Sequence, residues 1–247
     1  MVTQLSTQPN LLIVIATYNE IDNLPRLVAQ LEALFPQAQI LVIDDASPDG
    51  TGKWCDDANE KHPQLSVVHR ARKLGLGSAT IVGFQKALAR GIPFVATMDA
   101  DFSHDPASLV ELVAAISKGK DQTLGVAIGS RYIPGGAIVG WPWYRRLASR
   151  LVNWFSQWML RLPTHDNSGA FRVYRTSELK KIDLASLRSS GYGYLEEILW
   201  RLRREAVEMI EVPIVFSDRV RGKSKTSLLA GLNVFWQITK MGLGRWK

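Results

Sequence analysis

The sequence predicts an α/β fold in which a mostly parallel sheet is flanked by helices. Five short apolar runs, rich in β-branched residues, alternate with helical stretches over the first 130 residues. Each run is apolar at successive positions, so both faces of its strand must be buried, as in a parallel sheet covered by helices. The runs occupy residues 11–17, 39–45, 65–70, 94–100 and 124–130.

The second half of the chain adds three regular elements and an insertion. We interpret residues from about 135 to 165, which are aromatic and basic, as an insertion over the carboxyl edge of the sheet. No internal repeat or low-complexity tract divides the chain, so we expect a single domain over 1–247, with a flexible end at 1–10. The later patterns predict a helix over 195–204, a strand over 207–216 and a last helix over 227–241.

The composition is that of a globular protein with anionic partners. The 247 residues are 46% hydrophobic and 21% charged, and the formal net charge is +7. This charge favours nucleotides, phosphates or anionic lipid, whereas nucleic acid is disfavoured because an RNA-binding aromatic motif is absent. Cys55 is the only cysteine and the first ten residues do not resemble a signal peptide, so we expect a cytoplasmic protein. No charge-free apolar run reaches the roughly 18–20 residues of a membrane-spanning helix.

An acidic pair follows the fourth apolar run. Asp99 and Asp101 are one residue apart, and alternation along a strand would place both carboxylates on one face, where their repulsion requires a cation. Hard cations such as Mg²⁺ and Mn²⁺ take carboxylate ligands and share their other positions with water and substrate phosphates. The motif therefore predicts a metal site that neutralises a leaving nucleoside diphosphate. A solvated strand end is the alternative.

The ends of the first two runs carry groups that suit a nucleoside. In a parallel sheet these ends meet the acidic pair at the carboxyl edge. The carboxylate of Asp45 could accept hydrogen bonds from a nucleobase or ribose, as could Glu20, and the ring of Tyr18 could stack on a base. The same segments contain Ser, Asp and Gly residues typical of turns and helix starts, so a structural role is the alternative.

A basic loop is expected between the last strand and the last helix. Residues from about 217 to 226 include Arg219, Arg221, Lys223 and Lys225. Arginine makes forked contacts with phosphate and lysine supplies a point charge, so a mobile loop of this kind could close over a diphosphate. A solvated basic loop is the alternative.

Residues 145–162 predict an amphipathic helix within the insertion. An apolar stripe and a basic, polar stripe separate on a helical wheel, and Trp141 and Trp143 precede them. This composition is typical of a helix that lies in the headgroup region of a membrane. Packing of the apolar stripe on the body of the domain is the alternative. The apolar stripe contains Leu147, Leu151, Trp154, Phe155, Trp158 and Leu162, and the polar stripe contains Arg146, Arg150, Asn153, Gln157 and Arg161.

Seven segments occur in a distinctive order: ATYNE, VIDDASPDGTG, GLGSA, MDAD, GSRY, NSGAFR and RGKSKTS. Together they resemble family 2 glycosyltransferases and, more narrowly, the dolichol-phosphate or polyprenol-phosphate mannosyltransferases. The resemblance extends from about residue 11 to residue 228 and depends on the order and spacing of the segments. It implies the GT-A fold, a Rossmann-like α/β domain, here with an amphipathic helical insertion and a short C-terminal helix.

The resemblance also implies roles for individual residues. The residues implied for the donor are Tyr18, Glu20 and Asp45 for the nucleoside, Asp99 and Asp101 for the ribose and a Mg²⁺ or Mn²⁺ ion, and Arg219 with Lys225 for the diphosphate. Those implied for the acceptor phosphate are Arg131, Arg145 and Ser149. Asp99, Asp101 and Arg219 would be the catalytic residues. Family members often have Pro at Ala16 and Gln, a neighbour of the metal, at Ser103, so the ligands beyond Asp101 stay open.

The implied activity is inverting transfer of a hexose onto polyprenyl (dolichyl) phosphate, with mannose from GDP-mannose as the first choice of donor. The enzyme would be peripheral on the cytosolic face of a membrane, and a membrane-embedded partner subunit is compatible with this. A phosphate monoester, whose second pKa is about 6, is already an anion at pH 7. Such an acceptor needs positioning by arginines more than it needs a general base.

Three alternatives remain open from the sequence. UDP-glucose could replace GDP-mannose as the donor. A soluble family 2 enzyme acting on a glycan hydroxyl would need a carboxylate such as Asp105 or Asp166 as its base. A silent sugar-nucleotide-binding protein would show no donor turnover at all.

Overall fold

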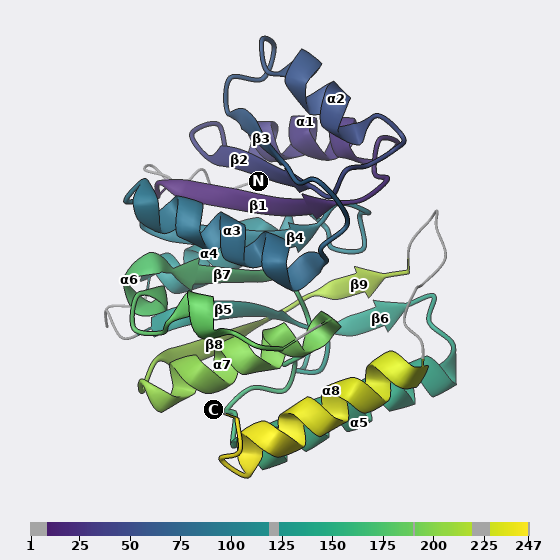
Figure 1. The fold of residues 1–247 in the computed structure, drawn as a ribbon, viewed down its shortest axis with the longest axis vertical. Helices are drawn as coiled ribbons and strands as arrows, with labels where there is room; N and C mark the ends of the chain where they lie inside the picture. Colours follow the sequence, from purple (N-terminus) through teal and green to yellow (C-terminus); the bar gives the residue numbers. More distant parts are fainter. Residues whose placement is uncertain (1–8, 119–123, 190, 219–227, 247) are drawn as a thin grey trace.

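The computed structural model describes residues 9–118, 124–189, 191–218 and 228–246. A seven-stranded sheet with helices on both faces forms the centre of the molecule (Figure 1), as the sequence predicts. Its order is β3-β2-β1-β4-β7-β5-β8, and only β7 runs antiparallel to its neighbours. The strands are β1 (Leu11–Thr17), β2 (Gln39–Asp44), β3 (Leu65–His69), β4 (Phe94–Asp99), β5 (Leu124–Ser130), β7 (Arg172–Arg175) and β8 (Glu208–Pro213).

The five predicted apolar runs all form strands of the sheet. The short strand β7, with the sequence RVYR, was not predicted, because four residues with an arginine at each end show no apolar run. The strand predicted over 207–216 is divided into β8 and a second strand, β9 (Val215–Ser217). β9 leaves the main sheet and pairs in parallel with β6 (Ala137–Val139) of the predicted insertion.

Helices cover the two faces of the sheet and bury its apolar side chains in two separate cores. Leu12 and Val14 of β1 point into one core, whereas Ile13 and Ile15 point into the other, because successive side chains of a strand face opposite sides. The helices are α1 (Leu24–Leu34), α2 (Thr51–Ala58), α3 (Leu76–Ala89), α4 (Ser108–Lys118), α5 (Trp143–Leu160), α6 (Thr176–Leu179), α7 (Tyr194–Arg204) and α8 (Leu228–Gly242).

Two of these helices lie at one end of the molecule, and both contribute to one of the two cores, with Leu160 of α5 and Val234, Ile238 and Met241 of α8. Figure 1 shows α5, the predicted amphipathic helix, running beside α8 at one end of the molecule. Their contact includes the rings of Phe155 and Phe235, whose centroids are 5.0 Å apart. None of the helices in the described residues is both long and apolar enough to cross a membrane.

Gly83 tests how tightly α3 packs on the sheet. A Cβ atom at this position would lie only 2.5 Å from Cγ1 of Val14, a buried atom of β1. We expect Gly83→Ala to lower the free energy of unfolding by about 1–3 kcal/mol, the usual cost of overpacking, as measured by urea denaturation. Gly231→Ala is the matched control in α8, where an added Cβ has no neighbour within 4 Å. There the change should be neutral or stabilise by up to about 1 kcal/mol, and equal losses in the two variants would contradict the packing argument.

Candidate active site

The turns that follow β1 and β2 are joined by side-chain hydrogen bonds. The Thr17 hydroxyl donates a 2.9 Å hydrogen bond to Asp44. The backbone N–H of Asn19 donates to Ser47, and the N–H of Ile21 donates to Asp49. Two turns that are far apart in the sequence are therefore held together at the carboxyl edge of the sheet, where ligands of such sheets bind.

Tyr18 and Glu20 lie in the first of these turns, and both side chains are half-buried. The ammonium of Lys73 lies 3.9 Å from the centroid of the Tyr18 ring, close enough for a cation–π contact. The carboxylate of Glu20 accepts a hydrogen bond of 3.0 Å from Asn23. The structure thus places both residues at the edge, and their contact with a nucleoside stays a prediction.

Asp45 already has several partners within the protein. Its carboxylate forms a buried ion pair with Arg70 and accepts hydrogen bonds from the backbone N–H groups of Leu74 and Gly75, at 3.1 and 2.9 Å. It thereby ties the loop before α3 to the end of β2. Gly77 begins the close approach of α3, because a Cβ there would lie 2.9 Å from the ring of Tyr194. Gly77 therefore has a structural use in the packing of α3, and the nucleoside role of Asp45 stays a prediction.

The acidic pair stands at the end of β4, but only Asp99 belongs to the strand. Asp101 lies in the bend that follows and is 5% exposed, so alternation along a strand does not decide its direction. The backbone turns sharply at Phe102, whose φ is 58°, and the N–H of Ser103 then donates a 3.0 Å hydrogen bond to Asp101. Beside it, the buried Ser103 hydroxyl has no hydrogen-bond partner among the described residues.

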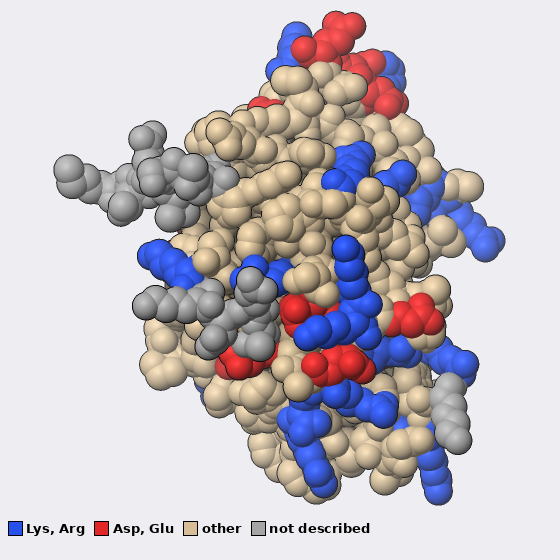
Figure 2. Space-filling view, turned by 90° about the vertical axis from the view of Figure 1, so that its left-hand side faces the viewer, with Lys and Arg blue, Asp and Glu red and all other residues tan. Residues whose placement is uncertain are grey.

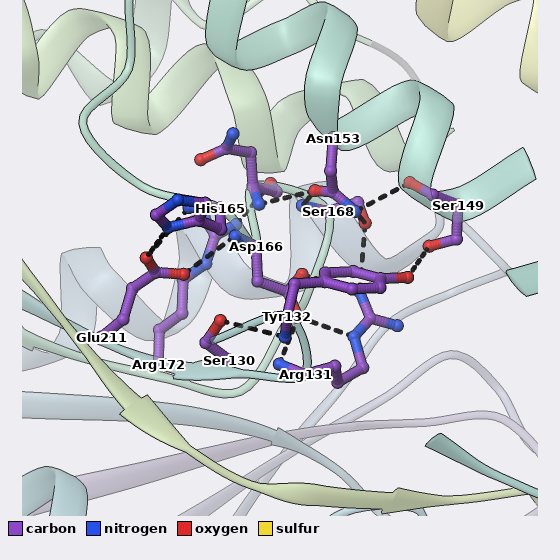
Figure 3. Close-up of polar contacts among 11 residues, drawn as sticks. Ser130, Arg131, Tyr132, Ser149, Asn153, His165, Asp166, Ser168, Arg172 and Glu211 are labelled. Atoms are coloured by element: carbon purple, nitrogen blue, oxygen red, sulfur yellow. Dashed lines mark hydrogen bonds and ion pairs between the residues drawn. The ribbon is translucent and has the colours of Figure 1, made fainter. Parts of the chain in front are cut away.

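Arg131 is the centre of a buried polar network at the end of β5 (Figure 3). Its guanidinium donates two parallel hydrogen bonds of 2.7 Å to Asp166, from Nε and Nη2, and Nη2 also donates to Ser168. Asp166 accepts the backbone N–H of Arg131 as well, at 2.9 Å. Both side chains are almost completely buried. The guanidinium is therefore held in one orientation, and its Nη1 has no hydrogen-bond partner among the described residues.

The pair shifts the pKa of both residues. Burial by itself would raise the pKa of Asp166, but the Arg131 guanidinium and its hydrogen bonds hold it below the usual value. Burial likewise opposes the charge of Arg131, whereas Asp166, with smaller contributions from Tyr132 and Asp99, raises its pKa. Both groups are therefore charged at neutral pH. The small contribution of Asp99 places this end of β4 on the same side of the sheet edge as Arg131.

Aromatic rings and α5 complete the surroundings of Arg131. Its guanidinium lies 5.6 Å from the centroid of the Trp141 ring, and that of Arg145 lies 3.9 Å from the same centroid. The Tyr132 hydroxyl donates a 2.7 Å hydrogen bond to the hydroxyl of Ser149 on α5. The structure thus brings together the three residues predicted for an acceptor phosphate. Arg145 in addition forms a partly exposed ion pair with Asp218 at 3.3 Å.

Asn153 fastens α5 to this network, a role that the sequence did not indicate. Its amide oxygen accepts the backbone N–H groups of Asn167 and Ser168, and its amide nitrogen donates to the Ser149 carbonyl and to the Ser168 hydroxyl. Asn153 is 3% exposed, whereas the helical wheel assigned it to a polar stripe together with surface arginines. The helical wheel predicted the period of α5 correctly. It could not show that Asn153, a polar residue, faces the body of the domain.

The apolar stripe of α5 is largely exposed. Trp154 and Trp158 are 60% and 62% exposed, and their rings stack in parallel with centroids 6.4 Å apart. Leu147 and Leu151 on the same stripe are also exposed, as are Trp143 and Tyr144 at the start of the helix. Two members of the predicted stripe behave differently: Phe155 packs on α8, and Leu162, beyond the helix, is buried. The alternative in which the whole stripe packs on the body is wrong.

The residues predicted to bind the diphosphate cannot be placed. Arg219 and Lys225, with most of the basic loop predicted over 217–226, lie outside the described residues. The strand before the loop, β9, ends at Ser217 beside the end of β6, so the loop starts next to the insertion. The role of Arg219 and Lys225 in binding the diphosphate stays a prediction.

The fold and the edge described above define a class of protein. A mostly parallel sheet with one antiparallel strand, an acidic pair after β4 and polar turns after β1 and β2 are arranged as in glycosyltransferases of the GT-A fold. Comparison with known proteins supports this class. The model of the glycosyl transferase family 2 matches residues 12–183, about two thirds of the chain. The chain belongs to this family, and it is a glycosyltransferase.

Two curated relatives are similar over most of their length. The polyprenol monophosphomannose synthase of Mycolicibacterium smegmatis is 42% identical over 87% of this chain and 80% of its own. The undecaprenyl-phosphate mannosyltransferase of Micrococcus luteus is 40% identical over 96% of both chains. By their names, both relatives are mannosyltransferases of polyprenyl phosphates, and this chain is similar to them.

Solved structures share the fold at much lower identity. Glucosyl-3-phosphoglycerate synthase from Mycobacterium tuberculosis, in complex with Mn²⁺, UDP and phosphoglyceric acid, gives a TM-score of 0.65 at 16% identity, covering 96% of this chain and 78% of that one. A mannosyltransferase from Pyrobaculum calidifontis, in complex with GDP-Man and Mn²⁺, gives 0.54 at 13% identity, covering 96% and 70%. At these identities the likeness concerns the fold alone, and it agrees with the predicted GT-A architecture.

The Arg131–Asp166 pair predicts a defined pH dependence of stability. Asp166→Asn leaves a buried guanidinium without its carboxylate, so we expect the free energy of unfolding at pH 7 to fall by about 3–5 kcal/mol. Because the pKa of Asp166 is lowered in the folded protein, its contribution is present above the unfolded value of 3.8 and is lost as the pH falls through the folded value. Urea denaturation at a series of pH values should show a larger acid-side loss of stability in the wild type than in the variant, which keeps the carboxylates of Asp49 and Glu197.

Glu196→Gln is a control variant, because the pH dependence that Glu196 gives to the free energy of unfolding has the opposite sign. Burial raises the pKa of Glu196, on the first turn of α7, to about 7. Its contribution to stability is present below its unfolded value of 4.5 and is lost as the pH rises through about 7. The Glu196→Gln variant should therefore be more stable than the wild type above pH 7 and similar to it at pH 4. The same pH profile of stability in Asp166→Asn and Glu196→Gln would contradict the opposite pKa shifts of the two carboxyl groups.

Proposed function

We propose that this protein transfers mannose from GDP-mannose to the phosphate of a polyprenol, with inversion at the anomeric carbon, on the surface of a membrane. The names of the two curated relatives support the sugar and the class of acceptor. The observation that carries the proposal is the position of α5. One side of this helix contributes Arg145 and Ser149 to the cluster around Arg131, and another side exposes a stripe of tryptophan and leucine.

The chemistry of the cluster suits a phosphate monoester as the nucleophile. An acceptor phosphate oxygen attacks C1 of the sugar while the bond from C1 to the nucleoside diphosphate breaks, and no proton has to move because the acceptor is already an anion. Arg131 would present its Nη1 to that anion, with its orientation held by Asp166. Arg145, stacked on Trp141, would add a second cation from α5.

The structure weakens the alternative of a sugar hydroxyl as the acceptor. Such a nucleophile needs a carboxylate free to take its proton. Both oxygens of Asp166 are bound by Arg131, and its pKa is lowered, so it is a poor base. Asp105 is exposed and accepts the backbone N–H of Ala107 near the start of α4. Neither of the two carboxylates considered for this role is arranged as a general base.

The residues after β4 fit a divalent cation. Two carboxylates and the buried Ser103 hydroxyl, which lacks a hydrogen-bond partner among the described residues, form an oxygen donor set of the kind that Mg²⁺ and Mn²⁺ take. No group of three or more His, Cys, Asp or Glu side chains suitable for a metal occurs in the described part of the chain. Asp99 and Asp101 would therefore hold the ion together with substrate phosphates. When bound, the ion would neutralise the charge of the departing diphosphate.

The exposed stripe of α5 supports docking on a membrane. Contiguous exposed apolar surface on a soluble protein marks an interaction site, and tryptophan with arginine is the composition of interfacial helices. Arg146 and Arg150, next to the stripe, are exposed as well. At about 1 kcal/mol for each arginine near anionic lipid, charge alone gives weak and reversible binding, so the apolar stripe must supply the rest. The protein would thus be peripheral, on the cytosolic face where nucleotide sugars are available.

Sugar transfer that depends on a metal tests the proposed function. Purified protein is incubated with labelled GDP-mannose or UDP-glucose and a polyprenyl phosphate, and the lipid-extractable label is measured. We expect transfer from GDP-mannose that a chelator abolishes and that added Mg²⁺ or Mn²⁺ restores. The double variant Asp99→Asn, Asp101→Asn should transfer at least about a hundredfold more slowly, because charge stabilisation of the leaving group is lost.

Asp105→Asn is the matched control, since it removes a nearby carboxylate that is exposed. Its transfer rate should remain close to that of the wild type. Full transfer by the double variant would exclude the proposed metal site. If the protein transfers sugar from UDP-glucose and not from GDP-mannose, the proposed donor is wrong. If it transfers sugar from neither nucleotide sugar, a silent binding protein is favoured.

The stripe on α5 predicts the strength of membrane binding. We expect the double variant Trp154→Gln, Trp158→Gln to bind phosphatidylcholine vesicles at least about tenfold more weakly for each tryptophan, because apolar burial in the interface is lost. Co-sedimentation with vesicles measures this directly. Leu74→Gln is the control, because Leu74 is an exposed apolar residue on the loop before α3. Unchanged binding by the double tryptophan variant would show that another surface meets the membrane.

A further inference from the structure

A cavity of about 650 Å³, the rear cavity, lies where α5, α7 and α8 end. Three tryptophans and three arginines are prominent in its lining: Trp158, Trp200, Trp246, Arg161, Arg203 and Arg204. Figure 2 shows many Lys and Arg side chains, with some Asp and Glu among them, over the lower half of this face of the molecule. No acidic side chain lines the cavity, so its chemistry suits an anion.

The walls of the rear cavity are well anchored. Trp246 lines it near the C-terminus, and its indole N–H donates a 2.9 Å hydrogen bond to Glu197 of α7. α8 reaches the end of α5 at Gly242, where a Cβ atom would lie 2.4 Å from Cγ of Met159. The cavity thus depends on close packing of three helices and does not lie in a loose surface loop.

The arginines of the rear cavity form no ion pair within the described part of the chain. No described acidic residue forms an ion pair with Arg161, Arg203 or Arg204, whereas Arg201, one turn earlier on α7, is paired with Glu197 at 2.7 Å. Arg204 lies over the ring of Trp200, 5.0 Å from its centroid. Three cations of like sign beside one cavity repel one another, and an anion between them would relieve this repulsion.

The rear cavity is continuous with the exposed stripe of α5, because Trp158 belongs to both. Arg145 and Arg161 are sixteen residues apart at opposite ends of this helix, a distance of about 24 Å at about 1.5 Å per residue. A helix lying flat on a membrane would therefore have one basic end at the proposed acceptor site and the other at this cavity. The headgroup layer would lie against both ends.

We propose that the rear cavity binds the phosphate headgroup of an anionic membrane phospholipid, at a site separate from that of the polyprenyl phosphate. The inference rests on the proposed membrane docking of α5 and adds a second, charge-selective contact to it. The three arginines bind the phosphate, and Trp158 and Trp246 lie beside the glycerol and the first part of the acyl chains. This contact sets the orientation of α5 on the surface and makes the protein select anionic membranes.

The triple variant Arg161→Gln, Arg203→Gln, Arg204→Gln tests this site. We expect it to bind vesicles that contain phosphatidylglycerol about a hundredfold more weakly than the wild type does, and to bind pure phosphatidylcholine vesicles equally well. The control variant Lys61→Gln, Lys86→Gln, Arg90→Gln makes the same change of charge at exposed positions outside α5, α7 and α8. Its binding to both kinds of vesicle should match the wild type. Equal losses in the two triple variants, or an equal loss on both kinds of vesicle, would overturn the proposal.

A soluble probe separates a lipid site from a phosphate site. Dihexanoyl phosphatidylglycerol, below its critical micelle concentration, should produce a saturable change in tryptophan fluorescence in the wild type. The single variant Arg161→Gln should bind this lipid more weakly. Inorganic phosphate should bind more weakly than this lipid, and equal binding of the two would overturn the assignment to lipid. Melting temperatures of all variants, measured in parallel, should stay within the range of the control variant.

Enzyme activity distinguishes this inference from the proposed function. Transfer to a short-chain polyprenyl phosphate without vesicles should be the same in the triple variant and the wild type, because none of the residues that line the rear cavity belongs to the Arg131–Asp166 network. A loss of transfer under these conditions would overturn the separation of the two sites. If the wild type transfers no sugar, the proposed function fails, and the vesicle measurements still decide whether the rear cavity selects anionic lipid.

Discussion

The buried ion pair between Arg131 and Asp166 is the constraint on which the candidate site depends. Two charges removed from water are costly unless they are paired and hydrogen-bonded, and here both requirements are met within one network. Glu211 of β8 accepts the backbone N–H groups of His165 and Asp166 and so fixes the segment that supplies the carboxylate. Three parts of the chain that are far apart in sequence are thereby held in one arrangement at the end of the sheet.

The same network explains how α5 is held with its apolar stripe outward. Asn153 satisfies two backbone N–H groups of the 167–168 segment, and Ser156 and Leu160 are buried on the same side of the helix. A helix that docks through a few satisfied hydrogen bonds can leave tryptophan and leucine exposed, although burying them would be favourable in water. This position of α5 fits a protein whose exposed tryptophan and leucine side chains meet a membrane. It places α5 between the membrane and Arg131.

Acidic and basic groups at the carboxyl edge of the sheet suit different parts of the proposed reaction. The acidic pair after β4 would need a cation and therefore suits the departing nucleotide, whereas the arginines on and beside α5 suit phosphates that arrive from a lipid surface. Asp99 makes a small contribution to the raised pKa of Arg131, so the strand end of the acidic pair lies near that arginine. The basic groups at the other end of α5, in the rear cavity, extend the positive surface along the membrane.

The sequence by itself determined the five apolar strands of the first 130 residues, the period of α5 and the class of the enzyme, but neither the short strand β7 nor the division of the last predicted strand into β8 and β9. Apolar runs that must be buried on both faces allow few arrangements, and the order of the motifs placed Tyr18, Glu20 and the acidic pair at one edge. Only the tertiary structure decided which polar groups are already occupied: Asp45 is bound by Arg70, Asp166 by Arg131, and Asn153 faces inward. These contacts join residues that are 14 to 35 positions apart. Local patterns of 2 or 3.6 residues carry no information about such pairs, because distant elements meet only when the whole chain packs.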